Sequence, residues 1–114
     1  MQVGKDSLKV RAKLKIGNQT FDYFSLKIAQ QKLGDISKLP YSLKILLENL
    51  LRHEDGRTVT TRDIQALVDW TKTKKSNQEI AFRPARVLMQ DFTGVPAVID
   101  LAVMRDAMVK MGAD

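Results

Sequence analysis

Apolar and polar residues alternate strictly from Leu8 to Ile16, with a Lys or Arg between successive apolar positions. This period of two predicts a half-buried strand. Gly17-Asn18 fits a tight turn, and Thr20–Phe24 resumes as the second arm of a hairpin. The cationic face carries none of the exposed aromatics on which RNA-binding sheets stack bases, so we favour a solvated edge over a nucleic-acid platform.

The apolar spacing then changes to that of amphipathic helices. Leu26–Leu33 predicts a short helix that ends at Gly34, a residue suited to a left-handed cap. A longer helix is predicted from Pro40 to near Asp55-Gly56. Its apolar face carries leucines three and four residues apart: Leu43, Leu46, Leu47, Leu50 and Leu51.

A third helix is predicted after either Thr60 or Thr61, each of which can serve as its N-cap. Asp63 falls in its first turn, where a carboxylate favours helix formation. The basic stretch that follows, Lys72–Asn77, is interpreted as a solvated loop, with a phosphate-binding patch as the less favoured alternative.

Two short apolar segments, Glu79–Phe82 and Val87–Met89, are separated by Arg83-Pro84 and predict short strands. A last helix is predicted from Pro96 to about Met111. It is apolar nearly all round, because its few charged residues do not share one face. Such a helix needs neighbours on several sides, which indicates that the chain belongs to something larger.

Composition narrows the chemistry that these elements can perform. The chain of 114 residues has the size of one domain, and 44% hydrophobic and 28% charged residues are ordinary for a globular protein. It contains no cysteine, so it cannot supply a disulfide, a thiolate zinc site or the ligands of an iron–sulfur cluster. The N-terminus lacks the apolar core of a signal peptide and no stretch is apolar enough to span a bilayer, so we expect no membrane partner and a cytoplasmic location.

The net charge of +6 is concentrated at the N-terminal end. Residues 1–40 carry eight Lys or Arg against three Asp. Positive charge steers polyanions without deciding what is recognised, so RNA is an alternative partner. The one histidine, His53, has no partners at metal-ligand spacing and is interpreted as a surface residue near a helix C-terminus.

The turn between Met89 and Pro96 is the candidate ligand site. Gln90 follows a predicted strand, and a neutral amide can orient a carboxylate or hydroxyl. Thr93 and Gly94 lead into the predicted helix, whose N-terminus is a possible anion site. Spacing alone favours simple turn chemistry for Gln90, Asp91, Thr93 and Gly94 over ligand binding.

The same stretch resembles a known family, the A-type aconitate hydratases, which include the iron-regulatory aconitases. The resemblance is carried by segments along nearly the whole chain: Leu33–Ile36, Leu39–Asn49, Arg83–Arg86, Gln90–Val98, Asp100–Ala102 and Met104–Asp106. Members of that family are several times longer, so the resemblance implies an amino-terminal fragment.

The resemblance implies a hydro-lyase that isomerises citrate to isocitrate through cis-aconitate in the tricarboxylic acid cycle. It implies that Gln90 contacts the substrate, that a 4Fe-4S cluster is held by residues outside this chain, and that the fragment has no catalytic or metal-binding residue and is inactive alone. Two alternatives stay open: an RNA-binding module of an iron-regulatory aconitase, and 2-methylisocitrate dehydratase activity.

The expected fold class is α/β, with an N-terminal β-hairpin, about four helices and short strands. By resemblance, these elements begin the first three-layer α/β/α domain of an aconitase. We expect a single unit made of a hairpin (1–24), a helical segment (25–78) and a strand-turn-helix (79–114) that carries the substrate-site motif.

Overall fold

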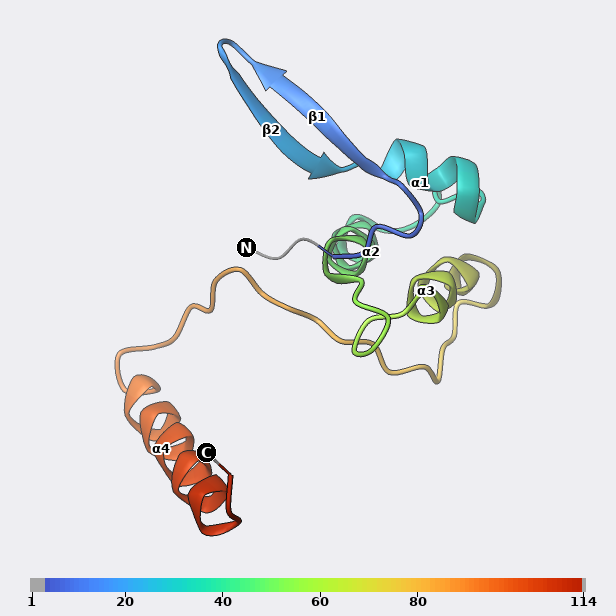
Figure 1. The fold of residues 1–114 in the computed structure, drawn as a ribbon. Helices are drawn as coiled ribbons and strands as arrows, with labels where there is room; N and C mark the ends of the chain where they lie inside the picture. The colour runs from blue at the N-terminus through green and yellow to red at the C-terminus, as the bar shows by residue number, and fades with distance from the viewer. Residues whose placement is uncertain (1–3, 114) are drawn as a thin grey trace. The chain divides into compact units, whose positions relative to one another are not determined.

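The structure, a computed structural model, describes residues 4–113. Two strands and four helices follow one another along the chain (Figure 1): β1 (Arg11–Ile16), β2 (Gln19–Phe24), α1 (Leu26–Leu33), α2 (Tyr41–His53), α3 (Thr61–Thr73) and α4 (Gly94–Lys110). The expected mixture of α and β structure is confirmed. Contacts divide the chain into a first unit that ends at Arg83 and a second that begins at Pro84.

The predicted hairpin forms, but only its base is buried. β1 and β2 pair antiparallel, with Ile16 opposite Gln19 across a two-residue turn in which Gly17 has a φ of +57°. Leu14 and Ile16 are 47% and 59% exposed, so the prediction of a half-buried strand is wrong for this part of β1. The reason is visible in Figure 1, where the two strands extend away from the helices of their own unit.

The first two helices lie close to their predicted bounds. α1 matches Leu26–Leu33, and the side chain of Ser25 accepts a hydrogen bond from the N–H of Ile28 at its start. Gly34 ends the helix with a positive φ of +98°, but its ψ of −174° lies outside the left-handed helical region that we expected. Pro40 occupies the N-cap of α2 rather than its first turn.

The structure shows which of the two threonines caps α3. Thr60 is the N-cap: its hydroxyl accepts a hydrogen bond from the N–H of Asp63 at 3.4 Å, and the Asp63 carboxylate accepts one from the N–H of Thr60 at 2.8 Å. This reciprocal pair is a capping box, which satisfies two N–H groups that would otherwise lack partners at the helix start.

The core of the first unit lies between the base of the hairpin and the first three helices. The predicted leucine face of α2 is confirmed, since Leu47, Leu50 and Leu51 are at most 1% exposed. The remaining buried apolar residues come from the other elements and the loops between them: Val10, Phe24, Ala29, Ile36, Leu39, Val59, Ile64, Leu67 and Val68. Ile80 and Ala81 pack partly against this core and bring the following segment onto the unit.

The second unit carries α4, which spans Gly94–Lys110 where we predicted Pro96 to about Met111. None of its residues is buried among the described part of the chain. Large apolar side chains are therefore exposed on every side of it, as the sequence pattern indicated. No helix of residues 4–113 has the length and apolarity to cross a membrane.

The predicted strands at residues 79–82 and 87–89 are absent from the described residues. A strand requires a neighbouring chain that accepts and donates ladder hydrogen bonds. No hydrogen bond between backbone groups joins these two stretches to another described residue. Their apolar composition alone therefore does not produce a sheet in this chain.

Candidate functional site

Gln90 lies immediately before the turn that leads into α4. Its carbonyl oxygen accepts a hydrogen bond from the N–H of Thr93 at 3.0 Å, which closes the turn. Gln90 is exposed, and its side chain makes no hydrogen bond to another described residue. The amide is thus free to bind a ligand, as the prediction for this residue requires.

The start of α4 offers fewer free donors than an ordinary helix N-terminus. The N–H of Val95 donates to Phe92 at 3.1 Å, that of Ala97 donates to Thr93 at 3.3 Å, and Pro96 has no N–H. Among the described residues, the N–H of Gly94 therefore has no partner in this turn. An anion here would meet one backbone donor and the helix dipole.

The side chains of Thr93 and Asp91 do not cap this turn. Thr93 occupies the N-cap position, but its backbone is helical (φ −61°, ψ −26°) and its side chain makes no cap hydrogen bond. The Asp91 side chain makes no hydrogen bond to a described residue either. The helical backbone at Thr93 explains the first difference, because side-chain capping requires an extended residue at that position.

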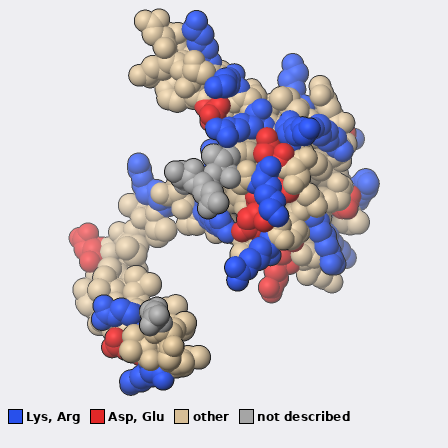
Figure 2. Space-filling view, viewed as in Figure 1, with Lys and Arg blue, Asp and Glu red and all other residues tan. Residues whose placement is uncertain are grey.

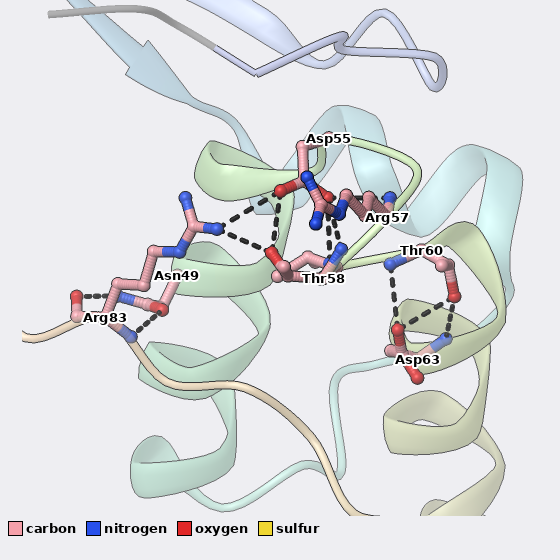
Figure 3. Close-up of polar contacts among 8 residues, drawn as sticks. Asn49, Asp55, Arg57, Thr58, Thr60, Asp63 and Arg83 are labelled. Carbon is pink, nitrogen blue, oxygen red and sulfur yellow. Dashed lines mark hydrogen bonds and ion pairs between the residues drawn. The ribbon is translucent and has the colours of Figure 1, made fainter. Parts of the chain in front are cut away.

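A polar network that the sequence did not reveal lies at the end of the first unit, on Arg83 (Figure 3). The Asn49 side chain on α2 accepts a hydrogen bond from the N–H of Arg83 at 3.0 Å and donates one to its carbonyl oxygen at 2.8 Å. The Arg83 guanidinium donates to Asp55 Oδ2 at 3.1 Å and to Thr58 Oγ1 at 2.5 Å. These contacts, which we call the Arg83 anchor, join residues up to 34 positions apart.

Asp55 organises the loop between α2 and α3. Its Oδ1 accepts hydrogen bonds from the N–H groups of Arg57, Thr58 and Val59 at 2.8, 2.7 and 3.0 Å. Its Oδ2 accepts the Thr58 hydroxyl at 2.6 Å. The Thr58 hydroxyl and the backbone N–H donors, those of Val59 and Arg57 first, hold the Asp55 pKa far below its usual range. The charged carboxylate is therefore favoured in the folded protein.

His53 lies in the last turn of α2, where we predicted a histidine without chemistry. It is half-buried. Burial lowers its pKa, and the nearby cations Arg83 and Arg52 lower it further. The neutral form is therefore favoured in the folded protein. The described residues contain no group of three or more His, Cys, Asp or Glu that could hold a metal ion.

The cations of the first strand are partly neutralised. Arg11 forms an ion pair with Asp22 at 2.6 Å, and Lys13 lies 3.9 Å from the other oxygen of the same carboxylate. The four cations of residues 8–16 are Lys9, Arg11, Lys13 and Lys15. Lys9 lies outside β1, so they do not all belong to one strand. Figure 2 shows Lys and Arg interspersed with Asp and Glu on the visible face of the first unit. RNA binding by this surface stays a prediction.

Comparison with known proteins finds relatives whose sequences match this chain over nearly its whole length. It is 62% identical over 115 residues to aconitate hydratase A of Legionella pneumophila, a match that covers 100% of this chain and 13% of the relative. The Pseudomonas aeruginosa and Escherichia coli proteins of the same name are 60% and 55% identical, over 96% and 99% of this chain and 12% of each relative. No family model matches the chain, and no solved structure matches it.

The chain is homologous to an amino-terminal segment of aconitate hydratase A. The family resemblance seen in the sequence is thereby confirmed. The chain spans about one eighth of the length of these aconitate hydratases, as their coverage of 12–13% shows. Both units of the structure fall within the match, including the Gln90 turn and the Arg83 anchor.

Proposed function

We propose that this chain is the amino-terminal part of an aconitate hydratase, a hydro-lyase that converts citrate to isocitrate through cis-aconitate. One observation carries the proposal: 62% identity to an aconitate hydratase A over 100% of the chain. The described residues contain no group of three or more His, Cys, Asp or Glu that could hold a metal ion, and we expect the isolated chain to be inactive. We place the enzyme in the cytoplasm, where a chain without cysteine pairs is ordinary.

In this proposal Gln90 positions the substrate. A primary amide both donates and accepts hydrogen bonds, so it can hold a carboxylate or hydroxyl in one orientation without adding a charge. Its exposure and the unpartnered N–H of Gly94 four residues later support the role. Thr93 and Gly94 would add the attraction of the α4 N-terminus for a carboxylate. Gln90 transfers no proton, because a side-chain amide neither gains nor loses a proton near neutral pH.

The 4Fe-4S cluster of the proposed enzyme would act as a Lewis acid on the substrate hydroxyl. The residues of this chain do not fit such a cluster, because it contains no cysteine and its described residues include no metal-ligating group. The cluster ligands must therefore come from elsewhere in the longer protein. What this chain contributes is the orientation of the substrate.

We also propose that residues 79–114 act as a strand-turn-helix unit of the first α/β/α domain in that longer protein. Exposed apolar side chains at residues 87–89 and around α4 support this placement, since they need packing partners. A neighbouring strand would also satisfy the backbone groups of residues 87–89.

The test of function is the Gln90→Ala substitution in the longer protein. We expect kcat/KM for citrate to fall by about tenfold to a hundredfold, because a misplaced substrate reacts slowly. The absorbance of the iron–sulfur cluster should not change. Gln31→Ala on the exposed face of α1 is the matched control, since the side chain of Gln31 makes no hydrogen bond to a described residue.

Unchanged kinetics in the Gln90→Ala enzyme would remove the substrate role of this residue. Assaying 2-methylisocitrate beside citrate decides the substrate class at the same time. Faster turnover of the methylated substrate would replace the citrate proposal.

A further inference from the structure

We propose that the apolar face of the β1–β2 hairpin is a docking surface whose occupant is the part of the longer polypeptide that follows residue 114. The inference rests on the proposed function in one respect, because it takes this chain as the amino-terminal part of a longer protein. It assigns no substrate contact to the hairpin. The docking surface and the role of Gln90 are therefore tested separately.

One face of the hairpin is apolar. Residues directly opposite each other in an antiparallel pair lie on the same face, and successive residues of a strand alternate between the two faces. Leu14 pairs with Phe21 and Ala12 with Tyr23, so these two pairs share a face with Ile16. We call these five residues the hairpin apolar face.

The opposite face is charged and suited to water. It carries Arg11 and Lys13 beside Asp22, the three residues joined by the ion pairs of 2.6 and 3.9 Å. Lys15 lies opposite Thr20 on the same side. A strand pair with one charged face and one apolar face is typical of a sheet that is covered on one side only.

The first unit leaves the hairpin apolar face uncovered. Phe21 is as exposed as Leu14, at 47%, and Tyr23 is 37% exposed. Of the residues in the two strands, only Phe24 at the base is buried. A two-stranded hairpin is at best marginally stable in water unless a further element packs on it. The alternation of these strands therefore fits a cover that the first unit does not supply.

The size of this face argues against a second copy of the chain as its occupant. A stable interface between separate proteins takes about 20–30 residues from each partner, whereas the hairpin apolar face has five. Association of separate chains also costs translational and rotational freedom, which so small a contact does not offset. A segment of the same polypeptide avoids most of this cost, because the linkage holds it near the hairpin.

The longer protein has ample chain for the cover. The present chain accounts for 12–13% of the aconitate hydratases that it matches, so about seven eighths of such a protein lie outside it. Within the chain, α4 is the other large apolar surface, and none of its residues is buried. Because α4 itself needs neighbours on several sides, it adds to the demand for chain from outside these residues.

Photo-cross-linking in the longer protein tests the proposal. The probe p-benzoylphenylalanine in place of Phe21 keeps an aromatic ring on the apolar face and, on irradiation, bonds to C–H groups that touch it. The control carries the same probe in place of Thr20, the neighbouring position on the charged face. We expect the Phe21 probe to give a product with the mass of one chain, cross-linked to a peptide beyond residue 114. The Thr20 probe should give little product.

Every other result overturns the proposal. A product of twice the chain mass would make a second copy the occupant, and a cross-link to Gly94–Lys110 would make it α4. No product from the Phe21 probe, or equal products from both probes, would show that the apolar face is not selectively covered.

A pair of substitutions supplies a second measurement. Leu14→Asp and Thr20→Asp add the same carboxylate to opposite faces of the hairpin. We expect Leu14→Asp to lower the unfolding midpoint of the longer protein by more than about 2 °C, because a charge would be buried beneath the cover. Thr20→Asp, opposite Lys15, should leave the midpoint unchanged.

Equal midpoints of the Leu14→Asp and Thr20→Asp proteins would contradict the docking surface. Neither this measurement nor the cross-link depends on turnover of citrate. Normal kinetics of Gln90→Ala would therefore remove the substrate role and leave the docking surface intact, and an uncovered hairpin would do the reverse.

Discussion

Gly4 lies against the end of α2 with no room for a side chain. Its N–H donates to the carbonyl oxygen of Arg52 at 3.3 Å, and the next residue, Lys5, donates to that of Glu54 at 2.7 Å. The N-terminal segment thereby satisfies carbonyl groups that a helix end leaves unpaired. A Cβ atom on Gly4 would lie 2.5 Å from the Glu54 carbonyl oxygen and 2.8 Å from that of Arg52.

We therefore expect Gly4→Ala to lower the free energy of unfolding of the first unit by about 1–3 kcal/mol, the usual cost of overpacking. Denaturant unfolding followed by circular dichroism measures it. Gly94→Ala is the control, because a Cβ on Gly94 meets nothing within 4 Å. Equal stability of the Gly4→Ala and parent chains would show that the N-terminal segment is not docked on α2.

At the scale of elements, the ends of helices depend on short local patterns. The Thr60 and Asp63 pair forms the capping box of α3 three residues apart, so all of its information is local. α1 likewise begins beside the Ser25 hydroxyl and ends at Gly34. α4 lacks a side-chain cap and relies on the turn closed between Gln90 and Thr93.

Thr60→Ala should lower the free energy of unfolding by about 1 kcal/mol, the typical cost of losing an N-cap. Its neighbour provides the control: Thr61 is exposed, makes no side-chain hydrogen bond to a described residue, and Thr61→Ala should cost much less. Denaturation midpoints of the two variants give the comparison. A larger loss in Thr61→Ala would contradict the assignment of the cap.

At the scale of the molecule, the first unit should lose stability on acidification. Burial and the cations Arg83 and Arg52 lower the His53 pKa, so the unfolded chain takes up this proton at a higher pH than the folded one. Stability from His53 is therefore present above the ordinary histidine pKa of about 6.5 and is lost as the pH falls below it. The pKa of Asp55 is lowered by the Thr58 hydroxyl and nearby N–H groups, and that of Asp63 by the N–H of Thr60.

The carboxylates of Asp55 and Asp63 contribute stability above the ordinary Asp pKa of about 3.9. This stability is lost as the pH falls below that value. Unfolding midpoints measured from neutral to acidic pH should therefore decrease in two windows. His53→Gln should remove only the upper one. A stability that rises as the pH is lowered from 7 to 5 would contradict the placement of His53.

Much of the fold could be predicted because its signals are local. The alternation from Leu8 to Ile16 predicted a hairpin, and the leucine spacing of residues 43–51 predicted the buried face of α2. The exposure of Leu14 could not be predicted, since periodicity identifies an apolar face but not whether anything covers it. The strand at residues 87–89 was predicted for the same apolar reason, and it has no partner strand here.

At the candidate site, the residue pattern alone favoured simple turn chemistry, and the family resemblance predicted that Gln90 contacts the substrate. In the structure Gln90 is exposed, and its side chain makes no hydrogen bond to another described residue. The Arg83 anchor could not be predicted, because Asn49 is an ordinary polar residue within a helix and its partner lies 34 residues away. An Arg-Pro pair predicts an extended backbone, but only the tertiary fold decides which side chain meets it.

The sequence by itself determined which segments are helices, that α1 ends at Gly34 and α3 starts at one of two threonines, and to which family the segment is homologous, because each depends on neighbouring residues or on their order. Tertiary structure decided which apolar faces are covered and which polar groups meet. Burial of the α2 leucines, the docking of Gly4 and the hold of Asn49, Asp55 and Thr58 on Arg83 all join distant residues. Such contacts arise only when packing brings the elements together.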